Sequence, residues 1–314
     1  MDDSPGFIGL IRDSLPPMAP LPPPPLSPAL EALVLPGKGP SRLCGIRGVL
    51  FDVYGTLFTS AAGDIEAAYQ SGEGETGEAP GSGTGGGMGP DGPVPGIGGS
   101  CTLGELKSYF RSAVREIRAK LSARTAWPEI RAEGIWAAFI RERGLAISPR
   151  ELALRYELAV NPVYPMPGAQ EILRELLAAG LTLGIISNAQ FYTPLLFEAF
   201  FGAAPDALGF DPGLLIYSYE LGEAKPSPRL FSKALDRLAL LEIPGENCLY
   251  VGNDMLNDIR PAATLGCKTL LFAGDGRSLR LRQDKPLIRD LKPTGIIRDL
   301  AGLRVLCNPG LEDA

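Results

Sequence analysis

Short apolar runs alternate with amphipathic segments through the second half of the chain, and this alternation constrains the fold more than any other feature. The spacing of the apolar residues predicts helix 169–179, strand 181–186, helix 191–201, strand 214–217, helix 228–238, strand 248–251, helix 257–265 and strand 269–272. Strands that alternate with helices form a parallel sheet covered by helices on both faces. The sequence therefore predicts an α/β fold with a three-layer, doubly wound parallel sheet.

The first strand of this sheet is predicted upstream, in the apolar run IRGVLFDVYGTLF that begins at Ile46. In an open parallel sheet, active groups gather at the carboxyl ends of the strands. Polar residues follow four of the predicted strands, namely Asp52, then Ser187 with Asn188, then Lys225, and finally Asn253, Asp254 and Asp258. We expect these side chains to meet at one edge of the sheet.

The chain contains no histidine. Mechanisms that need an imidazole as base, phosphate acceptor or zinc ligand are therefore excluded. The formal net charge of −6 provides no general field that would attract nucleic acid or anionic lipid. We expect a small-molecule substrate held by local groups, with neither nucleic acid nor membrane as a partner, and the oligomeric state is left open.

Composition divides the chain into parts. The proline-rich residues 1–43 are predicted to form a disordered tail, because such sequences prefer extended, solvated conformations. Residues 44–61 and 166–314 are assigned to the α/β core, and residues 62–165 to an inserted helical cap. Within the cap, residues 71–100 are rich in glycine and poor in large apolar side chains, which predicts a flexible insertion.

The expected compartment is the cytoplasm. No stretch approaches the roughly 20 apolar residues of a membrane span, and the opening MDDSPGFIGL carries acids where a secretory signal needs positive charge. The five cysteines are widely spaced and form no CxxC pair, so we expect them to be reduced, with Cys248 and Cys267 buried beside strands.

Four segments carry a family resemblance. F-D-V-Y-G-T-L, I-I-S-N, A-K-P-S-P-R-L-F and V-G-N-D-M-L-N-D resemble, in order and spacing, the four motifs of the haloacid dehalogenase-like superfamily. The likeness spans about residues 46–275. It implies a Rossmann-type core with a helical cap that closes over the active site, and it implies hydrolase chemistry.

The resemblance assigns roles that the side-chain chemistry supports. Asp52 would be the nucleophile, because a carboxylate can attack phosphorus or carbon and form an ester that water then hydrolyses. Lys225 would keep Asp52 ionised and offset charge on the substrate. Thr56, Ser187 and Asn188 would bind substrate oxygens.

Asp254 and Asp258 suggest a hard cation, since Mg²⁺ is usually held by one or two carboxylates together with water and substrate oxygens. By the superfamily's pattern the remaining ligands would be Asp52 and the backbone carbonyl of Tyr54. The spacing leaves open whether Asn253 or Asp254 takes the metal-binding place. The predicted cofactor is Mg²⁺, or none if the chain is a true 2-haloacid dehalogenase.

The first motif departs from the phosphatases of the superfamily, which carry a second aspartate two residues after the nucleophile to protonate the leaving group. This chain has Tyr54 there, as D-x-Y-G-T-L-F does in the L-2-haloacid dehalogenases it resembles. A halide departs without a proton, so Tyr54 favours dehalogenation, whereas the extra acid of the fourth motif favours a Mg²⁺-dependent phosphatase. Both chemistries stay open, and a catalytically inert binding protein is the alternative.

Overall fold

The structure is a computed structural model, and it describes residues 4–15, 17–35, 43–62, 94, 96–97 and 101–307. Of the glycine-rich insertion predicted at 71–100, all but Val94, Gly96 and Ile97 lies outside the described residues.

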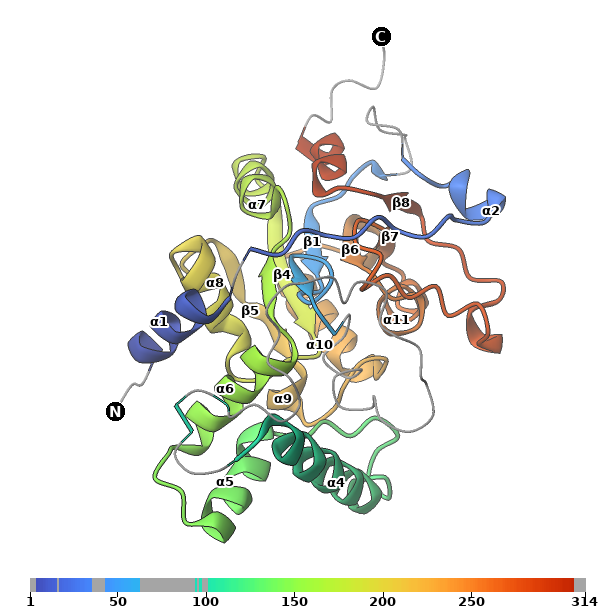
Figure 1. The fold of residues 1–314 in the computed structure, drawn as a ribbon. Coiled ribbons are helices and arrows are strands. Elements are labelled where there is room, and N and C mark those ends of the chain that lie inside the picture. The colour runs from blue at the N-terminus through green and yellow to red at the C-terminus, as the bar shows by residue number, and fades with distance from the viewer. Residues whose placement is uncertain are drawn as a thin grey trace.

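Six parallel strands form the central sheet in the order β5-β4-β1-β6-β7-β8 (Figure 1). Their bounds are β1 (Gly48–Phe51), β4 (Thr182–Ser187), β5 (Phe210–Tyr217), β6 (Cys248–Gly252), β7 (Lys268–Phe272) and β8 (Gly295–Ile297). The first strand, β1, lies in the middle of the sheet. The next strands along the chain, β4 and β5, extend the sheet on one side of β1, and β6, β7 and β8 extend it on the other side. The strand order therefore reverses at β1, and ligands of doubly wound sheets bind at such a reversal.

Helices cover both faces of this sheet, as the sequence predicts. They are α7 (Ala169–Ala178), α8 (Thr193–Phe201), α9 (Ser218–Leu221), α10 (Pro228–Leu240) and α11 (Arg260–Thr264), with the π-helical turn η3 (Met255–Ile259) and the 3-10 helices η2 (Gly245–Asn247), η4 (Pro286–Ile288) and η5 (Leu300–Cys307). Side chains alternate along β1, so Val49 and Phe51 join the apolar cluster with α7 and α8, whereas Leu50 joins the cluster with α10. The predicted three-layer fold is confirmed.

The cap consists of α4 (Leu103–Leu121), α5 (Ala132–Arg143) and α6 (Pro149–Val160). The antiparallel strands β2 (Phe58–Ser60) and β3 (Val163–Pro165) lead from the core and back to it. Phe110, Trp136 and Tyr156 are buried between the cap helices. The ring centroid of Trp136 lies 5.2 Å from that of Phe110 and 4.8 Å from that of Tyr156. These aromatic residues therefore form the apolar core of the cap.

The N-terminal segment contradicts the predicted disordered tail. Residues Ser4–Ser14 form α1, whose buried Phe7 and Ile11 pack in the main core, and Pro28–Glu31 form α2. Residues 17–27 run extended between them across the molecule (Figure 1). Proline composition suggested disorder, but Phe7, Ile11 and Leu15 recur at the spacing of one helix face and bury their side chains.

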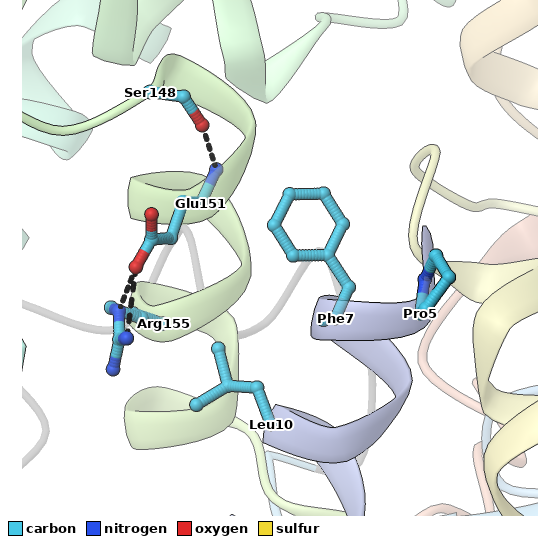
Figure 2. A pocket seen from close by; sticks show the side chains of 7 residues that line it. Pro5, Phe7, Leu10, Ser148, Glu151 and Arg155 are labelled. Carbon is cyan, nitrogen blue, oxygen red and sulfur yellow. Dashed lines mark hydrogen bonds and ion pairs between the residues drawn. The ribbon is translucent and has the colours of Figure 1, made fainter. Parts of the chain in front are cut away.

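Helix α1 contacts α8 of the core and α6 of the cap. Figure 2 shows Phe7 and Leu10 of α1 facing α6, where Ser148, Glu151 and Arg155 line the other side of a cleft of about 490 Å³. The N-terminal helix thus touches both parts of the molecule.

A buried carboxyl lies where the cap joins the core. Asn161 Nδ2 donates to Glu157 Oε1 over 2.9 Å, and Asn161 Oδ1 accepts from the Ser60 hydroxyl and the Ala62 amide over 2.8 and 3.0 Å. Glu157 Oε2 finds no hydrogen-bond partner among the described residues. Burial raises the pKa of Glu157 to about 7, against the opposing hydrogen bonds from Asn161 and Tyr192.

We expect Glu157→Gln to raise stability at pH 8 and to leave it nearly unchanged at pH 4. An acid whose pKa is raised in the fold contributes stability that is fully present below its unfolded pKa and is lost as pH rises through its folded pKa. The window is therefore about pH 4.5 to 7, and the effect is about 3 kcal/mol. Urea unfolding at both pH values measures it, with exposed Glu116→Gln as the control, and identical pH profiles for wild type and variant would contradict it.

Along the described part of the chain, no helix is long and apolar enough to cross a membrane. The four cysteines whose side chains the structure describes are free thiols, as predicted, although Cys267 is only half-buried beside the buried Cys248.

Candidate active site

Asp52 lies directly after β1, at the point where the strand order reverses. Its backbone amide donates to the Val251 carbonyl of β6 over 2.9 Å, so the neighbouring strand fixes its position. The chain then turns through Gly55, whose φ of +84° favours glycine and where a Cβ would overlap Ser278 and Asn253. The turn therefore packs closely against the loops that follow β6 and β7.

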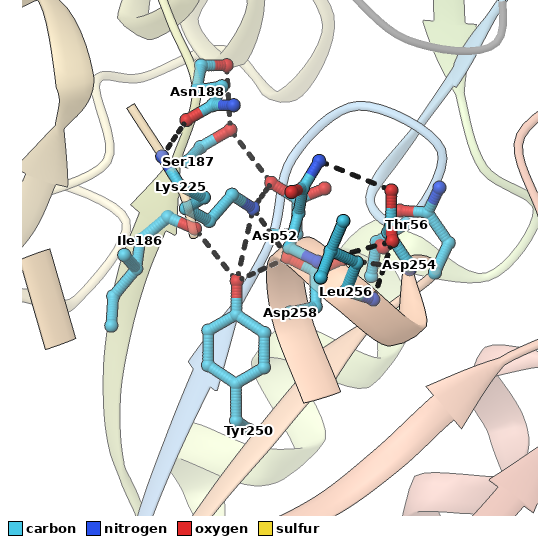
Figure 3. A network of polar contacts seen from close by, with 12 residues as sticks. Asp52, Thr56, Ile186, Ser187, Asn188, Lys225, Tyr250, Asp254, Leu256 and Asp258 are labelled. Atoms are coloured by element: carbon cyan, nitrogen blue, oxygen red, sulfur yellow. Dashed lines mark hydrogen bonds and ion pairs between the residues drawn. The ribbon is translucent and has the colours of Figure 1, made fainter. Parts of the chain in front are cut away.

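Lys225 joins the first and fourth sequence motifs. Its Nζ donates to Asp52 Oδ1 and to Asp258 Oδ1, each over 2.6 Å, and also lies 3.2 Å from the Tyr250 hydroxyl (Figure 3). All of these side chains are buried; Lys225 is 4% and Asp52 7% exposed. One ammonium group is thus shared by two carboxylates away from water.

Burial and the neighbouring charges together set the pKa values of Asp52, Asp258 and Lys225. Burial raises the pKa of Asp52, although Lys225 and Ser187 oppose the change. Burial likewise raises the pKa of Asp258 to about 7, with Lys225 opposing and Asp52 and Asp254 adding to it. Burial lowers the pKa of Lys225, but the charges of Asp258 and Asp52 outweigh it, so the net pKa is raised. Lys225 therefore stays charged and holds the two acids together.

The three predicted substrate-binding side chains lie around this cluster, but each has a partner within the protein. Ser187, at the end of β4, donates to Asp52 Oδ1 over 2.9 Å. Asn188 Oδ1 accepts from the Lys225 backbone amide over 2.7 Å. Thr56 Oγ1 donates to Asn253 Oδ1 over 3.2 Å. Ser187 is thus next to the predicted nucleophile, whereas Asn188 holds the lysine loop and Thr56 holds the fourth motif.

The predicted Mg²⁺ ligands do not converge in the way that the resemblance implies. Asp254 Oδ1 accepts from the Leu256 and Asn257 amides and caps the π-helical turn, and its Oδ2 pairs with Arg282 over 2.7 Å. Asp258 Oδ1 is bonded to Lys225, and its Oδ2 accepts from the Asp254 amide over 3.0 Å. Within the described residues, no three acidic or thiol side chains form a group that could hold a metal ion. Asp254 and Asp258 already neutralise cations and accept from amides, whereas the resemblance implies that they are available to bind Mg²⁺.

Three residues of this region were not predicted from sequence. The Tyr250 hydroxyl lies 2.9 Å from the Ile186 carbonyl and 3.0 Å from Asp258 Oδ1. Thr193 Oγ1 lies 2.8 Å from the Tyr54 hydroxyl, and Arg282 pairs with Asp254. Tyr250 lies within β6, where its sequence pattern predicts a core residue. Its contact with Asp258 is therefore known only from the structure. No local pattern marks Thr193 or Arg282.

Burial raises the pKa of Tyr54 well above that of an ordinary tyrosine, and the nearby Glu157 adds to this effect. The Tyr54 hydroxyl therefore stays protonated and bonded to Thr193 at neutral pH.

In doubly wound parallel sheets ligands bind where the strand order reverses, and in this protein a lysine-paired carboxylate lies at that point. A family model described as haloacid dehalogenase-like hydrolase matches residues 46–266. This match covers more than half of the chain, so the chain belongs to the haloacid dehalogenase-like hydrolase family.

Two curated proteins are similar in sequence. Phosphoserine phosphatase of Thermus thermophilus is 31% identical over 162 residues, which cover 48% of this chain and 61% of that protein. The rhythmically expressed gene 2 protein of Drosophila melanogaster is 30% identical over 102 residues, which cover 32% of this chain and 37% of that protein. The chain thus matches less than two thirds of the length of either relative.

Among solved structures, a 2-haloacid dehalogenase from Pseudomonas syringae is 23% identical with a TM-score of 0.46, and the match covers 83% of this chain and 97% of that one. A phosphatase from Thermococcus onnurineus is 19% identical with a TM-score of 0.46, covering 82% of this chain and 96% of that one.

Proposed function

We propose that this hydrolase forms a covalent ester on Asp52 and acts on a small metabolite whose leaving group departs without being protonated. The first candidate is a 2-halocarboxylate. The observation that carries the proposal is the buried Lys225 ammonium, 2.6 Å from Asp52 Oδ1 and from Asp258 Oδ1. A binding protein has no need for such a pair, whereas a carboxylate nucleophile must be kept ionised in a buried site.

The contacts of Asp52 support a nucleophilic step followed by a hydrolytic step. Lys225 and Ser187 both bond Oδ1 of Asp52, which leaves Oδ2 to attack the substrate carbon and release halide. Water then cleaves the ester at the Asp52 carboxyl carbon, giving a 2-hydroxycarboxylate and a proton and restoring the carboxylate.

The choice of leaving group rests on Tyr54. Its hydroxyl lies 2.8 Å from Thr193 Oγ1, and its raised pKa makes it a poor proton donor. An alkoxide leaving group needs an acid, and residue 54 does not supply one. A halide needs none, so the site suits carbon–halogen cleavage better than cleavage of an alkyl phosphate.

The fourth motif now supports the same choice. The acid that favoured Mg²⁺ in the sequence, Asp254, is engaged by a helix cap and by Arg282. We therefore propose a reaction that requires no divalent cation.

A second candidate is hydrolysis of an acyl or aryl phosphate with Mg²⁺. The sequence similarity to a phosphoserine phosphatase favours it. Phosphoserine itself has an alkoxide leaving group, so its hydrolysis needs a proton that Tyr54 does not provide, whereas acyl and aryl phosphates have better leaving groups.

A substrate panel separates the candidates. Purified protein would be incubated with 2-haloacids, acyl phosphates, aryl phosphates and alkyl phosphates, each with Mg²⁺ and with chelator. We expect halide release in both conditions. Phosphate release that requires Mg²⁺ would replace the first candidate by the second, and the absence of any product would favour the inert binding protein.

A further inference from the structure

Arg282 donates two hydrogen bonds to Asp254. Its Nη2 lies 2.7 Å and its Nε 3.2 Å from Asp254 Oδ2. The Asp254 side chain is 6% exposed and that of Arg282 is 30% exposed, so the carboxylate is buried while the guanidinium keeps some contact with water. Arg282 also has a φ of +52°, a left-handed conformation that residues other than glycine rarely adopt. The backbone is thus held in an unfavourable conformation at the residue that delivers this cation.

The loop that carries Arg282 is bonded along its length to the fourth motif. The Arg280 amide donates to the Asn253 carbonyl and the Met255 amide donates to the Arg280 carbonyl, each over 2.9 Å. Asn253 Nδ2 donates to the Ser278 carbonyl over 2.6 Å. Residues 275–282, called the 275–282 loop below, are therefore fixed against the site in strand-like register.

The N-terminal segment holds the other side of this loop. The Leu21 amide donates to Asp275 Oδ1 and the Gly276 amide donates to the Leu21 carbonyl, each over 2.8 Å. Arg277 also bonds the Ala19 carbonyl. A Cβ at Gly276 would overlap the Pro22 carbonyl oxygen, so the two segments are in close contact. The 275–282 loop therefore packs against the N-terminal segment on one side and against the fourth motif on the other.

We propose that Arg282 is the resident cation of this site: its guanidinium neutralises Asp254 where a divalent cation would otherwise bind. With Lys225 between Asp52 and Asp258, the three buried acids face two fixed cations. The 275–282 loop and the N-terminal segment keep Arg282 in place. This inference rests on the proposed metal-independent function and extends it to a residue outside the four motifs.

The test measures metal binding without any substrate. The melting temperature of the full chain would be recorded with chelator and with Mg²⁺ at about 10 mM, for wild type and Arg282→Gln. We expect no shift for wild type and a rise of about 3 °C for Arg282→Gln, because a ligand that binds only the folded state stabilises it. Arg282→Lys, which keeps the charge, should resemble wild type.

Arg289→Gln is the matched control, since it removes the same charge from an exposed position in the segment that follows. Its melting temperature should not respond to Mg²⁺. A Mg²⁺-induced rise in wild type would overturn the proposal, as would an unchanged melting temperature for a folded Arg282→Gln. Because these outcomes need no turnover, they stand apart from the halide and phosphate assays that test the proposed function.

Discussion

Asp52→Asn is expected to abolish turnover, lowering kcat by at least about a thousandfold, and to leave the protein folded. The amide has the size of the carboxylate, and its oxygen can still accept from Lys225 and Ser187, which now bond Asp52 Oδ1. It cannot form the ester. The variant also removes a buried charge whose pKa burial already raises, so we expect little loss of stability.

Mass spectrometry of the quenched enzyme provides the direct readout for this prediction. During turnover the wild-type peptide that contains Asp52 should carry the mass of the substrate fragment, and the variant peptide should not. Ser187→Ala serves as the comparison, because it removes one hydrogen bond to Asp52 and should slow the reaction about tenfold while keeping the adduct. An Asp52→Asn variant that retains a tenth of wild-type activity would rule out Asp52 as nucleophile.

The convergence of Asp52, Ser187, Lys225 and Asp258 could be predicted from sequence. Each follows a strand, and the carboxyl ends of parallel strands share one edge of the sheet. Short apolar runs were enough to locate β1, β4 and β6, because these strands are buried throughout or nearly so and strands buried on both faces have continuous apolar sequences.

The partners of each side chain within the cluster could not be predicted. The spacing of Asp254 fits both a metal ligand and a helix cap, and its partner Arg282 lies 28 residues away in an irregular loop. The N-terminal segment shows the same limit. Proline composition describes an isolated chain, whereas the backbone amide of Leu21 and the carbonyl of Ala19 have partners in the distant 275–282 loop.

Lys225→Met is expected to abolish activity and also to destabilise the fold by about 3–5 kcal/mol at pH 8. The substitution leaves Asp52 and Asp258 buried side by side without the ammonium that now lies 2.6 Å from each. Breaking a buried ion pair costs more than losing its attraction, because the remaining charges stay desolvated. The melting temperature should fall by on the order of 10 °C.

The pH dependence separates this electrostatic account from a loss of packing. The pKa of Asp258 is raised to about 7 even beside Lys225, and removing the lysine should raise it further. An acid with a raised folded pKa stabilises the fold below its unfolded pKa and loses that contribution as pH rises. The destabilisation by Lys225→Met should therefore be much smaller at pH 5 than at pH 8.

The double variant Lys225→Met with Asp258→Asn completes the test. It removes one of the two carboxylates left without the ammonium, so it should recover part of the stability lost at pH 8 while remaining inactive, because Asp52 still lacks the cation that keeps it ionised. Denaturant unfolding at both pH values, together with the halide assay, measures both effects. Equal destabilisation of Lys225→Met at pH 5 and pH 8 would mean that Lys225 stabilises the fold through its packed aliphatic stem rather than through its charge.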